Sequence, residues 1–233
     1  MKRVGHKGAD LISPGNTVAS FKAALQADVD MIEFDVLRLR DGRIVFAHDL
    51  ADGTRHDALT LDEGLDHLAG DAYEGVELDI DMKLPGYERE VVEAVSSRGL
   101  HDRALISSFY LDSLDEVARL APGIRRGLSV PRVQRDYTKS PLALPAYGVA
   151  RVARAWLPRR IGPLMRAGRI QAVMAHWLLV SRRLVEVAHA QGGEVYVWTV
   201  DDARRIERLH AIGVHAVITN DPRLFGPREA PAR

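Results

Sequence analysis

The stretch Met31-Ile-Glu-Phe-Asp-Val36 is apolar at every second position, and Leu78-Asp-Ile-Asp-Met-Lys83 repeats the same alternation. Successive side chains of a strand point to opposite faces, so each stretch has one apolar and one charged face. Within a pattern of alternating strands and helices, the apolar face should meet the helices, which directs the carboxylates into a closed sheet. The alternative is an antiparallel edge strand whose acidic side chains face water.

Short β-rich runs alternate with stretches of helical period along the 233 residues. Eight strand-helix units in a chain of this length favour a single TIM (β/α)8 barrel of the α/β class. An open doubly wound sheet would need a nucleotide-type glycine loop, which the chain lacks. We expect the barrel to span residues 1–225, followed by a flexible tail at 226–233. The strands are expected at Arg3–Gly8, Met31–Leu39, Val76–Lys83, Arg103–Phe109, Ile124–Val130, Ala172–Trp177, Glu194–Val200 and Ala216–Thr219.

The composition excludes several classes of chemistry. The chain contains no cysteine, so disulfide scaffolds, cysteine-zinc sites and thiol nucleophiles are ruled out. Basic and acidic side chains number 32 each, and no nucleic-acid motif is present, so we expect no nucleic-acid partner. The N-terminus lacks the apolar run of a signal peptide, and no apolar stretch is long enough to span a membrane. A cytoplasmic protein is therefore expected.

Asp41-Gly42 is a strong signal for a hairpin that folds back on the strand of Glu33 and Asp35. If these two residues form the whole loop, His48 lies directly opposite Asp35, with their Cβ atoms about 4.5–5.5 Å apart. A bulge in the loop would shift this register by one residue.

Side chains at the carboxyl ends of barrel strands line the active mouth. His6 ends the first expected strand, so His6 and His48 would flank a cluster formed by Glu33, Asp35 and Asp81. Buried carboxylates need a cation, and oxygen ligands favour Mg2+ or Ca2+. Two imidazoles can share the roles of general base and general acid.

Two lysines and one tryptophan complete the expected site. Lys83, and with a weaker signal Lys7, could balance an anionic substrate, and this inventory fits metal-assisted displacement at a phosphodiester. Trp198 ends the seventh expected strand. It could form an apolar wall for the glycerol or another leaving group, or simply pack at the rim.

The order and spacing of these motifs resemble those of glycerophosphodiester phosphodiesterases from His6 to Pro222. The matching motifs are His6-Lys-Gly8, Pro14-Gly-Asn-Thr17, Glu33-Phe-Asp35, Asp41-Gly42, His48-Asp49, Leu78-Asp-Ile-Asp-Met-Lys83, Ser107-Ser-Phe109, Val197-Trp-Thr-Val200 and Thr219-Asn-Asp-Pro222. The resemblance implies a metal-dependent TIM barrel that hydrolyses glycerophosphodiesters to glycerol 3-phosphate and an alcohol. By position, the resemblance implies that His6 and His48 are the catalytic histidines. It likewise implies that Glu33, Asp35 and Asp81 are the metal ligands and that Lys83 contacts the phosphate.

Three positions depart from the family pattern. Lys7 replaces an arginine, which keeps the charge but loses a two-pronged phosphate contact. Gly15 stands where the family has a glutamate, and Asp81 is one methylene shorter than the usual third ligand. The more distant sphingomyelinase D enzymes resemble this chain in using aspartate there. Two alternatives therefore stay open: a lysophospholipase D-like enzyme that could release a cyclic phosphate, and a degraded barrel that only binds phosphodiesters.

The segment 137–185 contains nine basic side chains and no acidic one, interleaved with apolar residues. Such a segment could rest on an anionic membrane surface, which would suit a lysophospholipid substrate and a membrane-peripheral location. The alternative is a solvated barrel helix with an arginine-rich face. Prolines at 141, 145, 158 and 163 predict that the segment is broken into short helices.

Overall fold

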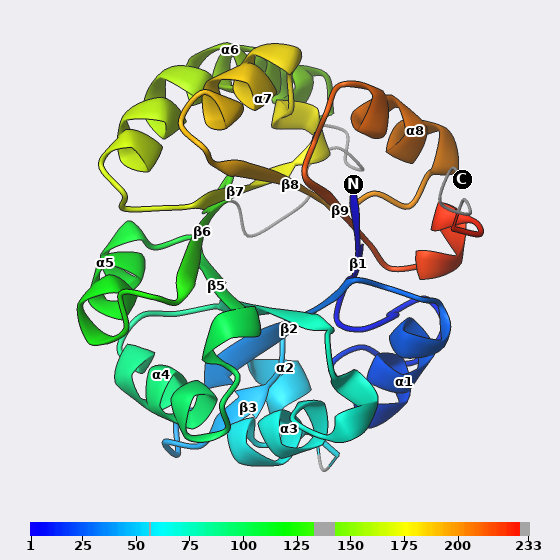
Figure 1. Cartoon of the computed structure of the whole chain (residues 1–233), viewed down its shortest axis with the longest axis vertical. Helices are drawn as coiled ribbons and strands as arrows, with labels where there is room; N and C mark the ends of the chain where they lie inside the picture. The colour runs from blue at the N-terminus through cyan, green and yellow to red at the C-terminus, as the bar shows by residue number, and fades with distance from the viewer. Residues whose placement is uncertain (56, 133–142, 229–233) are drawn as a thin grey trace.

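A computed structural model describes residues 1–55, 57–132 and 143–228. Eight parallel strands form a closed barrel, because β1 pairs with β9 on one side and with β2 on the other (Figure 1). The (β/α)8 prediction is confirmed, and the open sheet is excluded by this closure. The barrel strands are β1 (Lys2–Gly5), β2 (Met31–Arg38), β4 (Glu77–Met82), β5 (Ala104–Ser108), β6 (Arg125–Val130), β7 (Ala172–His176), β8 (Glu194–Trp198) and β9 (Ala216–Thr219).

Helices surround the barrel and cover its outer face (Figure 1). The first helix begins at a capping box. The Thr17 hydroxyl accepts from the Ser20 amide and the Ser20 hydroxyl accepts from the Thr17 amide, which satisfies two amides that have no partner within the helix. After the last strand, a short 3-10 turn at Pro222–Phe225 stands where a full helix would complete the pattern. The α-helices are α1 (Val18–Gln26), α2 (Leu50–Gly53), α3 (Leu61–Leu68), α4 (Glu88–Ser97), α5 (Leu111–Leu120), α6 (Ala143–Arg166), α7 (Arg182–His189) and α8 (Ala203–Ala211).

The two faces of β2 and β4 behave as their sequences predict. Ile32 and Phe34 are fully buried in the core between barrel and helices, where the Phe34 ring meets that of α1 residue Phe21. On the other face, Glu33 lies in register with Asp79, and Asp35 with Asp81. Parallel strands in register therefore bring four carboxylates together inside the barrel.

The expected register of the hairpin is wrong by one residue. The third strand, β3 (Ile44–Phe46), runs antiparallel to β2 and pairs Phe46 with Val36, so the partner of Asp35 is Ala47. Gly42 has a φ of 91°, and Leu39 pairs with Arg43, which makes a loop of three residues. Aspartate followed by glycine suits both this bulged loop and the shorter one. His48 consequently lies beyond the paired strands.

The expected interruption of residues 143–166 by proline is also wrong, because α6 is one helix of 24 residues with Pro158 and Pro163 inside it. Burial of Leu157, Ile161 and Met165 against the body of the protein holds this part of the helix in place. No helix in the described residues is long and apolar enough to cross a membrane. At the C-terminus, Arg228 pairs with Asp28 and Asp30, whereas residues 229–233 of the predicted tail lie outside the described residues.

Candidate active site

A cavity of about 590 Å³ opens at the carboxyl ends of the barrel strands. One side of it is polar and the other is apolar, and the two sides come from opposite parts of the barrel. The polar side contains His6, Glu33, His48, Asp79, Asp81 and Lys83, whereas the apolar side contains Phe109, Met174, Trp198 and Ile218. A molecule with an anionic and an apolar part could therefore bind across the cavity.

Three buried carboxylates, those of Glu33, Asp35 and Asp81, form the centre of the polar side. Each offers an oxygen within 4.8 Å of the others. Burial raises the pKa of Glu33 well above its usual range, and the Asp35 charge raises it further. Burial likewise raises the pKa of Asp81. So much negative charge in so little space requires positive charge nearby.

Lys83 supplies positive charge from within the chain. Its ammonium pairs with Asp35 and lies 2.5 Å from Asp81 Oδ2. Burial would raise the pKa of Asp35, but this ammonium and the imidazole of His48 bring it well below its usual range. Although burial opposes the charge on Lys83, the same carboxylates raise its pKa. Asp35 and Lys83 are thus a buried ion pair.

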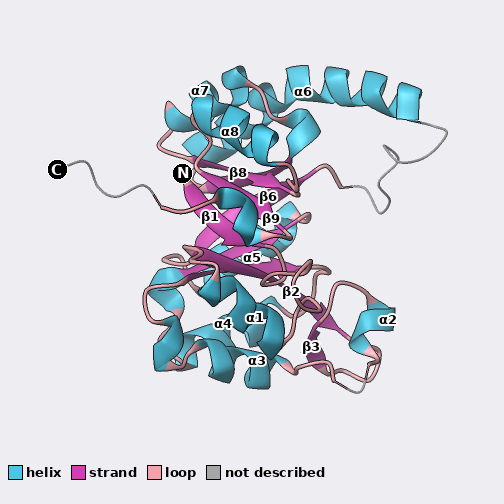
Figure 2. Cartoon of the chain, turned by 90° about the vertical axis from the view of Figure 1, so that its right-hand side faces the viewer, coloured by secondary structure: helices cyan, strands magenta, loops and turns pink. Residues whose placement is uncertain are grey.

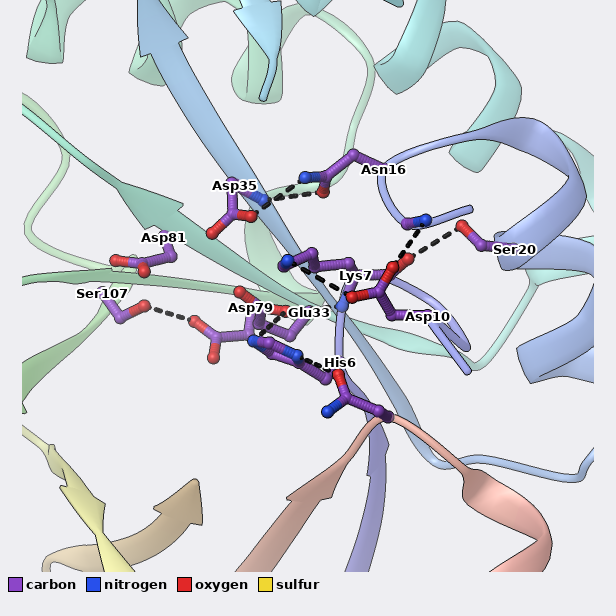
Figure 3. Close-up of polar contacts among 12 residues, drawn as sticks. His6, Lys7, Asp10, Asn16, Ser20, Glu33, Asp35, Asp79, Asp81 and Ser107 are labelled. Atoms are coloured by element: carbon purple, nitrogen blue, oxygen red, sulfur yellow. Dashed lines mark hydrogen bonds and ion pairs between the residues drawn. The ribbon is translucent and has the colours of Figure 1, made fainter. Parts of the chain in front are cut away.

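Asn16 fixes the orientation of Asp35. Its Nδ2 donates to Asp35 Oδ2 at 2.9 Å, and its Oδ1 accepts from the Asp35 amide at 3.0 Å (Figure 3). Asn16 is buried and has a φ of 59°, a left-handed conformation that asparagine tolerates better than most residues. It comes from the Pro14–Thr17 motif, for which the sequence suggested no individual role.

His6 is held by a chain of hydrogen bonds behind it. Its Nδ1 lies 2.5 Å from Asn220 Oδ1, and Asn220 Nδ2 donates to Asp201 Oδ2 at 2.7 Å. Since the amide nitrogen faces Asp201, its oxygen faces His6, which assigns the imidazole proton to Nδ1. Nε2 is then free to accept a proton and lies 3.9 Å from Glu33 Oε2. Burial lowers the pKa of His6, which favours this neutral form.

His48 lines the same cavity but is held less tightly. Its side chain is about half exposed (51%), and its Nδ1 is 3.9 Å from Asp49 Oδ2. Asp49 caps α2 by accepting from the Ala51 and Asp52 amides. His48 therefore faces the cavity from the segment that connects β3 to α2, not from a barrel strand.

Asp79 lies deeper and was not predicted as a site residue. Its Oδ1 accepts from the Ser107 hydroxyl at 2.7 Å (Figure 3), and burial raises its pKa to about 7. The period-two pattern placed Asp79 on this face, but only the position of Ser107 on the adjacent strand shows what it contacts.

Trp198 lines the apolar side of the cavity and also packs at the rim, whereas its contact with a leaving group stays a prediction. Its Nε1 donates to the Met174 carbonyl at 2.7 Å, and its ring meets Phe109 edge to face with centroids 6.2 Å apart. At the mouth, the Arg132 guanidinium lies 4.1 Å from the ring centre of Tyr110. These contacts hold the apolar wall rigid.

Lys7, Asp10 and Gly15 form one packed unit beside the carboxylates. The Lys7 amide donates to Glu33 Oε2 at 2.7 Å, and its Nζ lies 3.3 Å from Asp10 Oδ2. Asp10 Oδ1 accepts from the Gly15 amide at 2.8 Å (Figure 3). A Cβ at position 15 would lie 2.6 Å from Asp10 Oδ1 and 2.7 Å from Lys7 Cβ. The family pattern has a glutamate at position 15, and in this chain the Asp10 carboxylate lies next to that position instead.

The Gly15→Ala variant should lower kcat/KM at least about tenfold, since the added methyl group must displace Lys7, and misplacement by about 1 Å can cost about 10²-fold. The control is Gly148→Ala, because a Cβ there meets no atom within 4 Å. Steady-state kinetics of both variants test this, with circular dichroism to confirm folding. Equal activity of the two variants would show that the packing around Gly15 does not matter.

The residues present suit a divalent cation. The cluster of Glu33, Asp35 and Asp81 offers only oxygen, which Mg2+ and Ca2+ prefer. Within the described part of the chain, Asp81 Oδ1 is buried and has no hydrogen-bond partner, so the protein supplies no donor to this oxygen, which suits a cation ligand.

Comparison with known proteins gives a consistent result. The model of the Glycerophosphoryl diester phosphodiesterase family matches residues 6–65 and 53–224. A glycerophosphodiester phosphodiesterase of Caldanaerobacter subterraneus subsp. tengcongensis is 28% identical over 253 residues, which covers 94% of this chain and 93% of that protein.

Two solved structures share the fold. The glycerophosphodiester phosphodiesterase from Agrobacterium tumefaciens aligns with a TM-score of 0.68 at 21% identity, covering 97% of this chain and 99% of that one. An Oleispira antarctica phosphodiesterase in complex with the product sn-glycerol-3-phosphate aligns with a TM-score of 0.69 at 22% identity, covering 95% and 94%.

Proposed function

The chain belongs to the glycerophosphoryl diester phosphodiesterase family, and on that premise we propose that it hydrolyses glycerophosphodiesters to glycerol 3-phosphate and an alcohol with the help of one divalent cation. The observation that carries the proposal is the meeting of His6, Lys83, Glu33 and Asp81 in one cavity, with the third buried carboxylate of the cluster, Asp35, next to them. The relative from Oleispira antarctica, with sn-glycerol-3-phosphate bound, supports the same product class.

The anionic phosphodiester would bind at the polar side of the cavity. Glu33, Asp35 and Asp81 would hold Mg2+ or Ca2+, which when bound polarises a phosphoryl oxygen and offsets negative charge. Lys83 lies against the same carboxylates and offers its ammonium to the phosphate. The Lys7 ammonium lies beside Asp10 rather than against the three carboxylates, because its Nζ donates to Asp10 Oδ2.

Two proton transfers complete the reaction. Neutral His6 takes the proton of the attacking oxygen on Nε2 as the new bond to phosphorus forms, while Asn220 keeps Nδ1 protonated. His48 donates a proton to the departing alcohol oxygen as the other phosphorus-oxygen bond breaks. Its exposure at the mouth suits exchange of that proton with water.

The apolar side of the cavity favours a second candidate substrate, a lysophospholipid. Phe109, Met174 and Trp198 offer an apolar surface opposite the polar groups. Leu50 and Leu84 line the same cavity close to His48 and Lys83 in the chain, and both are exposed. With such a substrate the chain would act as a lysophospholipase D-like enzyme. The intact contacts around Lys7, Asp10 and Asp81 support catalysis over a site that only binds phosphodiesters.

Removal of divalent cations with EDTA should reduce turnover of glycerophosphocholine to background, and added Mg2+ or Ca2+ should restore it. Without the cation, the three carboxylates repel one another and the anionic substrate, and no metal polarises the phosphoryl oxygen. Phosphorus NMR measures the products and separates a hydrolysed from a cyclic phosphate. EDTA already saturated with Ca2+ is the control.

Two results would contradict the proposal. Full activity in EDTA would remove the cation from the reaction. Binding of glycerophosphocholine without turnover, with either metal, would identify the chain as a barrel that only binds. Turnover of lysophosphatidylcholine alone would instead favour the second candidate.

A further inference from the structure

One helix extends beyond the body of the barrel. Figure 2 shows α6 lying along the barrel and projecting past it on the side that carries β3 and α2. Its 24 residues make a rod of about 36 Å. The second half packs through Leu157, Ile161 and Met165, whereas Arg151, Val152 and Arg154 in the first half are exposed. The first half of α6 therefore projects on the side of the molecule where β3 and α2 lie.

The exposed face of this helix combines an apolar stripe with arginines. Val152 and Trp156 are one turn apart, and each is 61% exposed. The Arg159 guanidinium lies 5.1 Å from the ring centre of Trp156. A large aromatic ring beside arginines, left in water, is typical of a helix that lies in the interface of a membrane.

Within the described residues, the arginines of this face have no acidic partner. The salt bridges of the described residues include none for Arg151, Arg154, Arg159 or Arg160. No acidic residue occurs between 137 and 185, although the described structure of that segment begins only at 143. The helix thus presents uncompensated positive charge that an anionic surface would match.

The mouth itself adds exposed apolar side chains on the same side. Leu11 and Ile12 follow β1, Leu84 follows β4, and Leu50 begins α2, with exposures between 37% and 62%. Leu50 and Leu84 also line the cavity. Apart from Met1, every exposed large apolar side chain of the described residues belongs to these loops or to α6.

We propose that residues 148–160 of α6, together with the loops at the mouth, bind the surface of a bilayer that contains anionic phospholipid, so that the cavity receives a phosphodiester from a lipid headgroup. This inference rests on the proposed function for the identity of the substrate, but the binding itself does not require turnover. Trp156 and Val152 enter the headgroup region, and the arginines contact lipid phosphates.

Charge decides between a bilayer and a second copy of the chain. A symmetric dimer formed through this face would bring the same arginines of two copies together without acidic partners, which is unfavourable. An anionic bilayer offers phosphates to every arginine and an apolar layer to Trp156. Residues 148–160 contain a single aromatic residue, Trp156, whereas proteins that bind single-stranded nucleic acid stack several bases on successive rings.

Cosedimentation with vesicles tests the proposal. The full chain should bind vesicles of phosphatidylcholine mixed with phosphatidylglycerol, bind pure phosphatidylcholine weakly, and lose binding at high salt. Arg151→Glu/Arg159→Glu should lower the partition coefficient for the mixed vesicles at least about tenfold, since each basic residue near such a surface contributes several-fold. Trp156→Ala should weaken binding to the mixed vesicles at low salt, because it removes the aromatic side chain that enters the headgroup region.

The matched control is Arg204→Glu/Arg208→Glu, which makes the same charge change at exposed positions of α8. It should keep vesicle binding, and all variants should hydrolyse glycerophosphocholine in solution at the rate of the unmodified chain. Absence of binding to anionic vesicles, or equal loss in both arginine pairs, would overturn the proposal. So would a change of oligomeric state in the α6 variants with vesicle binding unchanged.

The outcomes separate this surface from the reaction. Vesicle binding without hydrolysis of any glycerophosphodiester would overturn the proposed function and leave the surface standing. Hydrolysis in solution without vesicle binding would overturn the membrane-binding surface and leave the proposed function standing. A loss confined to lysophosphatidylcholine held in vesicles, with turnover of glycerophosphocholine intact, is the result that we expect for the α6 variants.

Discussion

His6→Ala should lower kcat for glycerophosphocholine at least about 10²-fold, with a much smaller effect on KM. Proton transfer by a positioned side chain contributes about 10²- to 10⁴-fold to a rate, and His6 is the group whose free Nε2 faces the cavity. The phosphate contacts proposed for Lys83 and Lys7 would remain in the variant, so substrate binding should persist. Steady-state kinetics at saturating divalent cation measure both constants.

A surface histidine provides the control for this variant. His210 lies exposed on α8, so His210→Ala should keep the activity of the unmodified chain. Thermal unfolding of both variants checks that neither has lost its fold. Activity of His6→Ala within a few-fold of the unmodified chain would remove His6 from the proton transfer, and His48 alone would then have to be considered.

Lys83→Met should destabilise the protein by about 3–5 kcal/mol when divalent cations are removed, because it leaves the buried charges of Asp35 and Asp81 without their partner. For a chain of this size the loss corresponds to a fall in Tm of about 10 °C. Mg2+ or Ca2+ should raise the Tm of the variant more than that of the unmodified chain, because a bound cation would replace part of the missing charge. Calorimetry with EDTA and with each metal measures both effects.

The control for Lys83→Met is Lys22→Met, which removes an exposed lysine of α1. Its Tm should be nearly unchanged and should respond to divalent cations as in the unmodified chain. If Lys83→Met were as stable as this control in EDTA, the ion pair with Asp35 would not be needed to hold the carboxylates. If its Tm rose no further with metal, the carboxylate cluster would not be a cation site.

The architecture could be predicted closely because it follows from local patterns. Alternation of period two in β2 and β4 determines which side chains face the interior, and the parallel register then places Glu33 beside Asp79 and Asp35 beside Asp81. The predicted strands agree with the observed ones to within three residues at either end. Such a pattern depends only on residues that are neighbours in sequence, so it can be recognised before the packing of the rest of the chain is known.

Prediction failed where two local structures were equally compatible with the residues. Asp41-Gly42 permits a loop of two or three residues, and the choice moves His48 out of its expected position opposite Asp35. Pro158 and Pro163 usually interrupt a helix, but burial of Leu157 and Ile161 keeps α6 continuous. In both cases packing against other elements decided the outcome.

By itself, the sequence determined the order of strands and helices, the inward direction of Glu33 and Asp35, and the family. Only the tertiary structure decided which groups meet: Asn220 with His6 across 214 positions, Asn16 with Asp35, and Asp10 with Lys7 and Gly15. The physical reason is that side-chain direction follows from backbone geometry over a few residues. A hydrogen bond between distant residues depends instead on how the closed sheet brings the ends of its strands together.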